Sequence, residues 1–222
     1  MTTAIIVAAG KSERMGPGTD KAFLSLVNKP VVAWSLMAFE KCPDVDRIVL
    51  VVRKDQQLAA KAVCQMFGIS KLDKIVAGGN KRQDSVLAGF AACDVDTRTV
   101  VIHDGARPLV TSEMISEVVK LGARTGGATV GRRMIDTVKV VEKGTTVERT
   151  VPREKLWQVQ TPQAFQFRVL RDAYKALGKT EVTDDCQAVE LNGGTVKIWE
   201  SNRLNLKITT PEDLQVAAAL LK

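Results

Sequence analysis

The chain has few of the side chains that enzymes commonly use for acid–base or metal chemistry. Its 222 residues include one histidine, His103, and four widely spaced cysteines. No two cysteines form a Cys-x-x-Cys pair, so neither a zinc site nor a dithiol redox site is predicted. Reduced thiols scattered in this way suit the cytoplasm, which is the compartment we expect. His103 ends an apolar run, and we expect it to have a structural role.

Long apolar runs are also missing. No stretch reaches the roughly 18 apolar residues that a membrane-spanning helix needs, so no membrane partner is expected. The sequence enters an apolar segment near Thr3 without a basic stretch and a cleavage site, which gives no sign of a secretory signal. Its 45% hydrophobic and 26% charged residues are typical of a globular protein. We therefore expect one domain, residues 1–222, with a small appendage.

Aromatic residues make up only 5% of the sequence, whereas the formal net charge is +7. An excess of positive charge indicates an anionic partner or a solvated positive surface. The basic residues are spread along the chain, and few aromatic rings are present to stack on bases. We therefore expect no nucleic acid among the partners. A non-catalytic, basic nucleic-acid-binding module is kept as an alternative, because it predicts salt-dependent binding that can be measured.

The segment IIVAAGKS, residues 5–12, ends like the P-loop of ATPases and GTPases. That motif requires a further glycine five positions before Gly10, where this chain has Ile5. The P-loop is therefore excluded, and a turn of small residues after an apolar strand remains to be explained. Ala8, Ala9 and Gly10 would let backbone N–H groups approach an anion closely.

Short segments rich in Val and Ile alternate with segments of helical composition. The expected buried strands are Thr3–Val7, Arg47–Val52, Leu72–Val76, Thr99–His103 and Ala128–Val130. The expected helices between them are Val31–Phe39, Asp55–Met66, Ser85–Cys93 and Ser112–Leu121. This alternation predicts an α/β fold with a Rossmann-like, mostly parallel sheet flanked by helices. Ligands of such sheets bind at the carboxyl ends of the strands, here the loops that begin at Ala8, Ala77 and Asp104.

The alternation stops at Asp136. Two β-prone runs flank Lys143-Gly144 and predict a hairpin, which is marginal in water by itself. Residues Asp136–Val151 should therefore pack against the body of the protein or against a second subunit. Further along, helices are expected near Arg168–Leu177 and Asp185–Leu191, a strand at Thr195–Trp199, and a closing helix capped by Thr210 with Pro211 in its first turn.

Charged residues gather in the three loops that follow expected strands. Lys11, Arg14 and Lys21 follow the small-residue turn. Gly78-Gly79 precede Lys81-Arg82, and Asp84-Ser85 stand near a helix start, where polar groups can meet a ligand. In the third loop, Asp104 can hold Mg²⁺ and Arg107 can bind phosphate through two parallel hydrogen bonds.

Seven motifs occur in an order that resembles one enzyme family. They are AAGKSERM, GGNKRQDSVLAG, HDGARP, DTVK, LWQVQTPQAF, TDD and NLKITTPEDL. In this order they resemble the 2-C-methyl-D-erythritol 4-phosphate cytidylyltransferases over residues 4–214. The resemblance implies a nucleotidyltransferase-type fold and transfer of CMP from CTP to methylerythritol 4-phosphate, with release of pyrophosphate, in the non-mevalonate isoprenoid pathway.

The resemblance also implies roles for particular residues. CTP would be bound by Ala8, Ala9, Gly10, Gly79, Arg82 and Ser85. Catalytic charge would come from Arg14, Lys21, Arg153 and Lys207. Methylerythritol phosphate would meet Asp104, Arg107, Thr137, Arg153 and Thr161. Mg²⁺ would be held by Asp104, with Asn205 as a second contact.

Residues 136–155, called the arm below, resemble the segment that crosses to a second subunit in that family. A homodimer is therefore expected, in which Arg153 completes the site of the partner. The implied reaction needs no histidine base, because a phosphate monoester with a second pKa near about 6 is largely ionised at neutral pH. Positioning and neutralisation of charge are then the main tasks of the protein.

Several positions depart from the family pattern. Asp20 precedes Lys21 where proline is usual, Ala22 replaces a common glutamine, and RRMIDT replaces a frequent PVxDT. A cytidylyltransferase for another polyol phosphate, such as ribitol 5-phosphate, is kept as an alternative. It would share the front loops and differ mainly around the arm and the TPQ segment.

Overall fold

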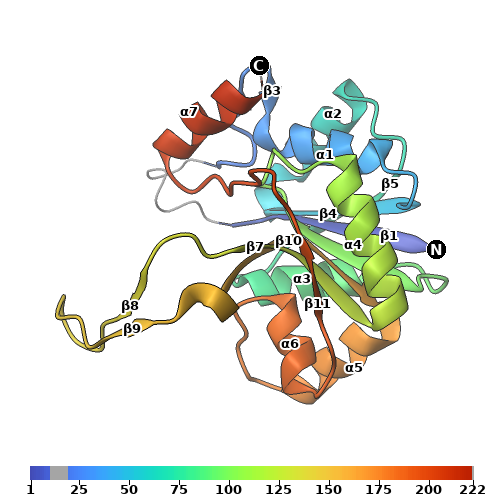
Figure 1. Ribbon diagram of the computed structural model, residues 1–222. Coiled ribbons are helices and arrows are strands. Elements are labelled where there is room, and N and C mark those ends of the chain that lie inside the picture. The colour runs from blue at the N-terminus through green and yellow to red at the C-terminus, as the bar shows by residue number, and fades with distance from the viewer. Residues whose placement is uncertain (11–19, 222) are drawn as a thin grey trace.

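The computed structural model describes residues 1–10 and 20–221, and a seven-stranded sheet runs through its centre (Figure 1). The strand order is β11-β7-β10-β6-β1-β4-β5. The bounds of these strands are β1 Thr2–Ala8, β4 Arg47–Val52, β5 Leu72–Ala77, β6 Thr99–Asp104, β7 Gly127–Arg133, β10 Trp157–Gln166 and β11 Lys197–Glu200. All neighbouring pairs are parallel except those of β10, which is antiparallel to β6 and β7. The predicted mostly parallel α/β fold is confirmed.

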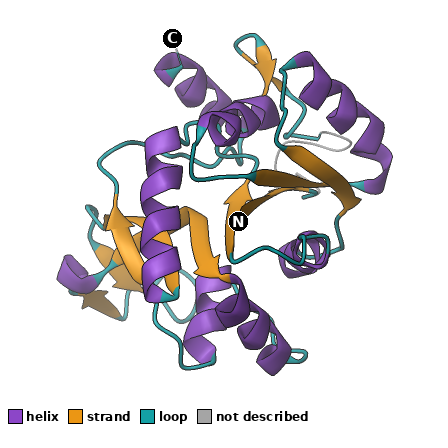
Figure 2. Ribbon diagram, turned by 90° about the vertical axis from the view of Figure 1, so that its right-hand side faces the viewer, coloured by secondary structure: helices purple, strands orange, loops and turns teal. Residues whose placement is uncertain are grey.

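Two layers of helices cover this sheet (Figures 1 and 2). One face packs against α1 Val31–Lys41, α2 Gln57–Met66 and α4 Ser112–Thr125. The other face packs against α3 Arg82–Ala91, α5 Phe167–Leu177 and α6 Asp185–Leu191. Successive residues of β1 serve opposite layers, since Ile6 belongs to the first core and Ile5 to the second. A strand that is buried on both faces must be apolar at every position, as IIV is.

The expected helices and strands are present, with one correction to the burial. Leu72–Val76 was expected to be a buried strand, but β5 lies at the edge of the sheet, and three of its six residues are exposed. Among the strands that the structure describes, only β4 pairs with it. The LWQVQTPQAF segment, which had no predicted secondary structure, forms most of β10.

The chain closes with α7 Pro211–Leu220, for which the sequence predicted both the cap and the first residue correctly. Thr210 and Asp213 form a reciprocal capping box, and Pro211 stands in the first turn. This helix packs through Ala217 against Leu26 and Ile208 in a separate small core. Leu26 lies in the short hairpin of β2 Ser25–Leu26 and β3 Lys29–Pro30, which the sequence analysis did not predict.

The arm contains the predicted hairpin, with β8 Val138–Val140 paired antiparallel to β9 Arg149–Val151. Gly144 in the connecting turn has a φ of 61°, a conformation that glycine adopts without strain. The hairpin forms a sheet of its own and extends away from the body of the protein, at the left of Figure 1. A short 3₁₀ turn, η3 Arg153–Lys155, leads back to β10, and a similar turn, η2 Lys54–Gln56, precedes α2.

Over the described residues, none of the helices combines the length and the apolar composition that crossing a membrane requires.

Candidate active site

A pocket opens at the carboxyl ends of β1, β5 and β6, where the fold predicts a ligand. Its walls come from three loops that are distant in sequence and from Lys207 near the C-terminus. The predicted site residues among its lining are Ala8, Ala9, Gly10, Lys21, Gly79, Arg82, Ser85, Asp104 and Lys207. Parallel strands bring their ends to one edge of the sheet, which is why residues about 200 positions apart can meet there.

Close backbone packing forms the floor of the pocket. A Cβ atom at Gly78 would lie 2.4 Å from Cβ of Ala9 and 2.7 Å from Oγ of Ser85. A Cβ atom at Gly79 would lie 2.3 Å from Cβ of Asp84. A larger residue at Gly78 would push the second loop away from the first, and one at Gly79 would press against Asp84 at the start of α3. The glycines therefore allow the small-residue turn and the start of α3 to share one wall.

The first turn of α3 points its backbone toward this wall. The Oγ of Ser85 accepts a hydrogen bond from the backbone N–H of Gly79 at 3.2 Å and donates to the carbonyl of Lys81 at 3.1 Å. Asp84 accepts from the N–H of Lys81 and completes the cap of the helix. The positive end of the α3 dipole favours an anionic ligand at this wall. Ser85 is 3% exposed, so its hydroxyl shapes the loop.

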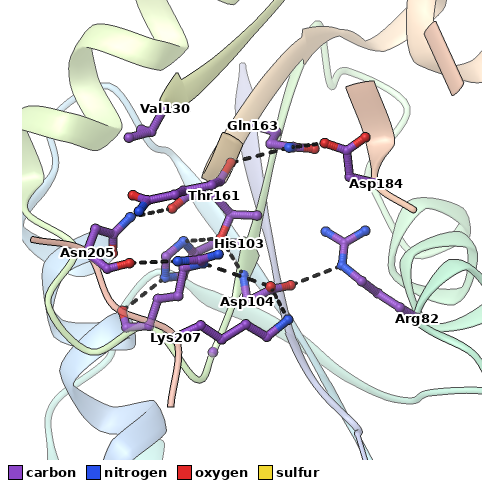
Figure 3. A network of polar contacts seen from close by, with 12 residues as sticks. Arg82, His103, Asp104, Val130, Thr161, Gln163, Asp184, Asn205 and Lys207 are labelled. Carbon is purple, nitrogen blue, oxygen red and sulfur yellow. Dashed lines mark hydrogen bonds and ion pairs between the residues drawn. The ribbon is translucent and has the colours of Figure 1, made fainter. Parts of the chain in front are cut away.

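Asp104 lies at the centre of the charged groups in the pocket (Figure 3). Its Oδ1 accepts a hydrogen bond from Nε of Arg82 at 3.0 Å, and its Oδ2 accepts one from Nζ of Lys207 at 2.6 Å. Nε of Arg107 lies 4.0 Å from Oδ2. Burial alone would raise the pKa of Asp104, but Arg82 and Lys207 hold this pKa far below its usual range. The carboxylate is therefore charged wherever the protein is folded at ordinary pH.

Arg82 divides its guanidinium between two carboxylates. Nε bonds to Asp104, and Nη2 bonds to Oδ2 of Asp185 at 2.8 Å. Burial would lower the pKa of Arg82, but the negative charges of Asp185 and Asp104 raise it above its usual value. Arg82 therefore stays protonated, and its position is set from both sides.

A chain of buried hydrogen bonds through Thr161 and His103 adjoins Asp104 (Figure 3). Oγ1 of Thr161 accepts from the backbone N–H of Asp104 at 3.0 Å and lies 3.1 Å from Nδ1 of His103. Nε2 of His103 lies 3.3 Å from the carbonyl oxygen of Arg107. One arrangement satisfies every group: Thr161 donates to Nδ1, and His103 donates from Nε2. Burial lowers the pKa of His103 to about 3, which keeps the ring neutral. The expected structural role of His103 agrees with this geometry.

Asn205 is buried next to the pocket, in contact with Thr161 and Arg107. Asn205 is 1% exposed, and its Nδ2 donates to the backbone carbonyl of Thr161 at 2.7 Å. The backbone carbonyl of Asn205 accepts from Nη1 of Arg107 at 2.6 Å. Asn205 is not among the residues that line the pocket. Asn205 thus joins the C-terminal loop to Thr161 and Arg107, and its buried Oδ1 has no hydrogen-bond partner among the described residues. The role of Asn205 as a second metal contact stays a prediction.

For a divalent cation, the described lining of the pocket offers two carboxylates, Asp20 and Asp104. No group of three or more His, Cys, Asp or Glu side chains that could hold a metal occurs among the described residues. Mg²⁺ is commonly bound through one or two carboxylates together with substrate phosphates, so Asp104 with a bound nucleotide fits this pattern. A cation would have to share Asp104 with Arg82 and Lys207.

Some predicted residues lie elsewhere. Arg107 and Thr161 support the pocket from beneath, whereas Thr137 and Arg153 are exposed on the arm. Arg14 lies outside the residues that the structure describes, as does Lys11. The predicted site residues that the structure describes thus fall into two groups: those at or beneath the pocket, and Thr137 and Arg153 on the arm, which do not line the pocket of the same chain.

The sequence analysis gave no role to other residues of the site. Asp20 lines the pocket beside Lys21, and burial raises the pKa of its carboxyl group. Its only signal in the sequence was the departure from proline at this position. Asp185 is fully buried behind Arg82, and its only signal was the TDD motif, to which no function had been assigned.

The parallel sheet, the small-residue turn and the cationic pocket at the strand ends define a nucleotidyltransferase-type α/β protein. The family model of IspD, 2-C-methyl-D-erythritol 4-phosphate cytidylyltransferase, matches residues 2–222. The chain belongs to this family, whose members are cytidylyltransferases.

Similar proteins are known by sequence and by structure. The chain is 45% identical to the 2-C-methyl-D-erythritol 4-phosphate cytidylyltransferase of Dehalococcoides mccartyi, over 99% of this chain and 95% of that protein. It is 44% identical to the enzyme of that name from Pelotomaculum thermopropionicum, over 99% and 93%. The crystal structure of 4-diphosphocytidyl-2C-methyl-D-erythritol synthase from Anaerococcus prevotii superposes with a TM-score of 0.88 at 29% identity, covering 99% of this chain and 95% of that one.

Proposed function

We propose that this protein transfers CMP from CTP to 2-C-methyl-D-erythritol 4-phosphate and releases pyrophosphate, as a step of non-mevalonate isoprenoid synthesis. Membership of the family supports this activity. The single structural observation that carries it is the set of cations around Asp104, at the strand ends beside a turn of small residues. Such a pocket suits a ligand with several phosphates and a second ligand with hydroxyl groups.

The reaction joins a phosphate oxygen of methylerythritol phosphate to the α-phosphorus of CTP. As that bond forms, the bond from the α-phosphorus to the bridging oxygen breaks, and the electron pair leaves with pyrophosphate. The attacking monoester is largely ionised at neutral pH, so no general base is required. The neutral, buried ring of His103 is consistent with this, because it offers no base to the pocket.

The protein then has to position two anions and neutralise the charge that develops. Lys21, Arg82 and Lys207 line the pocket and serve this purpose for the phosphates, and Arg14 is proposed to join them. Ala8, Ala9, Gly10, Gly79 and Ser85 line the side on which CTP is proposed to bind. Asp104 is proposed to accept hydrogen bonds from the hydroxyl groups of methylerythritol phosphate, with Arg107 and Thr161 holding it in place.

Mg²⁺, or another divalent cation, is proposed as the cofactor. Asp104 is the residue that would hold it together with the phosphates of CTP. When bound, it would neutralise phosphate charge and so favour the approach of the second anion. Excess EDTA should therefore abolish turnover, and added Mg²⁺ should restore it.

The arm is proposed to complete the site of a second subunit in a homodimer. Thr137 and Arg153 are exposed, and neither lines the pocket of its own chain. Apolar residues of the arm are exposed too, Val141 by 42% and Val147 by 51%, and a neighbouring surface would bury them. In this arrangement Arg153 positions methylerythritol phosphate in the partner.

We also propose that the enzyme acts in the cytoplasm and without nucleic acid. All four cysteines are free, and burial raises the pKa of the Cys64 thiol to about 11, which suits reduced, unreactive side chains. Filter binding with DNA and RNA at physiological salt should detect no affinity.

The test of the function is release of pyrophosphate from CTP with each of two acceptors. Methylerythritol 4-phosphate should support turnover, and ribitol 5-phosphate should support little. A preference for ribitol 5-phosphate would replace the proposed acceptor but keep the cytidylyltransferase. Lack of turnover with both would contradict the proposed function.

A further inference from the structure

Asp185 is a carboxylate that the proposed reaction does not use, yet it lies immediately behind the pocket. It is 0% exposed and does not line the cavity. Nη2 of Arg82 donates to its Oδ2 at 2.8 Å, and the hydroxyl of Tyr174 donates to its Oδ1. Burying an ionised carboxylate costs free energy unless it is paired and hydrogen-bonded, and Arg82 and Tyr174 provide that pairing here.

Neighbouring elements hold Asp185 in place. It is the first residue of α6, and its backbone N–H donates to Oε1 of Gln163 at 3.2 Å. Gln163 belongs to β10, and its Nε2 donates to Oδ2 of Asp184 at 2.8 Å (Figure 3). Asp184 also caps α6 through the N–H of Gln187 at 2.9 Å. The start of α6 is thus tied to the strand that pairs with β6, the strand of Asp104.

The geometry at Arg82 shows what this arrangement achieves. A guanidinium group is planar, and hydrogen bonds from two of its nitrogens to two anchors fix both its position and the direction of its plane. Asp104 supplies one anchor inside the pocket, and Asp185 supplies the other behind it. If Asp185 carried no charge, Asp104 would be the only anionic partner that Arg82 keeps among the described residues. Arg82 would then turn toward Asp104 and away from the nucleotide.

We propose that Asp185, with the Tyr174 hydroxyl, is a positioning residue for CTP that acts through Arg82. It holds the guanidinium partly away from Asp104 and presents the remaining N–H groups to the nucleotide. This inference rests on the proposed function, in which Arg82 meets CTP. It gives a role to the second aspartate of the TDD motif.

The test is a double-mutant cycle on kcat/KM for CTP, which can be measured even when CTP does not saturate. Asp185→Asn preserves the shape of the side chain and removes its charge. With Arg82 present, this change should lower kcat/KM for CTP about tenfold, the scale of one charge-assisted hydrogen bond. In an Arg82→Ala background, Asp185→Asn should change kcat/KM less than about twofold, because the residue through which it acts is missing.

Two further variants serve as controls. Tyr174→Phe keeps the carboxylate but removes one of its donors, so kcat/KM for CTP should fall by only about threefold. Asp172→Asn removes an exposed carboxylate of the same helix, where its partner is Arg171, and should leave kcat/KM unchanged. In each variant the KM for methylerythritol phosphate, measured at saturating CTP, should stay within about twofold of that of the unchanged chain.

The outcomes distinguish a role of Asp185 through Arg82 from a general structural role. An equal loss in both Arg82 backgrounds would show that Asp185 acts only through the general structure and would overturn the inference, as would no loss in either. If Asp185→Asn does not fold, Tyr174→Phe replaces it in the same cycle, with a threefold loss expected only where Arg82 is present. An unchanged chain that cannot use CTP would instead defeat the proposed function and the inference with it.

Discussion

Asp104 in the pocket and Arg153 in the arm are both charged, but their surroundings are opposite. Asp104 is 7% exposed and lies within 4.0 Å of three cationic side chains. Arg153 is exposed, and its guanidinium bonds to the backbone carbonyl of Ile135. A single chain thus gathers the charged groups around Asp104 by its own packing. The arm, in contrast, presents polar and apolar side chains to solvent, which agrees with the proposal that a second subunit covers them.

The largest effect should follow a change inside the pocket. Lys21→Ala should lower kcat by about 10²- to 10³-fold, the scale observed when one donor to a developing negative charge is removed. Lys21 lines the pocket and is not among the buried core residues, so the free energy of unfolding should change by less than about 1 kcal/mol. Steady-state kinetics and urea unfolding of the same samples test both parts.

Lys61→Ala on the exposed side of α2 is the matched control for this change, since it removes an equal charge outside the pocket. It should leave kcat unaltered. A Lys21→Ala chain with near-normal kcat would remove Lys21 from the catalytic residues.

A change on the arm should have the next largest effect, and it should be one that a second chain can correct. Arg153→Ala should lower turnover about 10²-fold if the residue positions methylerythritol phosphate in the partner. Chains with Arg153→Ala and chains with Lys21→Ala should regain activity when their subunits exchange. One of the two sites in each mixed dimer then has both residues.

The comparison would fail if mixed dimers formed without recovering activity. Such a result would mean that Arg153 acts in the site of its own chain. Native mass spectrometry of the exchanged sample establishes whether mixed dimers are present, so that missing activity cannot be ascribed to missing exchange.

The sequence predicted the pocket better than the network that supports it. The carboxyl ends of parallel strands meet at one edge, so the apolar runs and the polar residues after them were enough to place Asp104, Arg82 and Ser85 together. Ala8, Ala9 and Gly10 could be recognised because an anion needs small residues beside it. These are local signals, readable from neighbouring residues.

The contacts of Asp185 and Asn205 could not be predicted in this way. Their partners are far away in the sequence: Arg82 is 103 positions from Asp185, and Thr161 is 44 positions from Asn205. Pairing at such distances depends on the antiparallel insertion of β10 between β6 and β7, which the sequence did not indicate. A polar residue before a helix looks the same whether its side chain caps the helix, lines a pocket or lies buried beneath one.

A smaller effect concerns pH, because His103 is the only histidine in the chain. Burial lowers its pKa from 6.5 to about 3. The unfolded chain therefore takes up a proton as the pH falls below 6.5, and the folded chain does not until about pH 3. The contribution of His103 to the free energy of unfolding is therefore fully present above pH 6.5 and is lost as the pH falls from 6.5 toward about 3. The expected loss is about 1 kcal/mol between pH 6.5 and pH 5.5.

Urea unfolding at those two pH values measures this loss, and His103→Asn is the matched variant. Asparagine can accept from Thr161 in place of Nδ1, and it does not titrate. The variant should be less stable at both pH values, because the ring also packs against Phe39, yet the difference between the two should shrink. An undiminished difference would show that other groups cause it.

The smallest effect on folding should come from a substitution in the arm. Its effect on dimerisation tests most directly whether the arm differs from the pocket in needing a second subunit. Val147 is 51% exposed, so Val147→Ser should change the free energy of unfolding of a single chain by less than about 0.5 kcal/mol. In a dimer the same side chain would be buried, and its loss would cost roughly 1 kcal/mol. Twofold symmetry counts that cost twice, so the Kd of the dimer should rise at least about tenfold. Sedimentation at several concentrations measures this change.

Val95→Ser, at a position that is 96% exposed on the body, is the control and should leave the Kd unaltered. If both substitutions left the Kd unchanged, Val147 would lie outside the interface, and the arm would have to reach its neighbour through other residues.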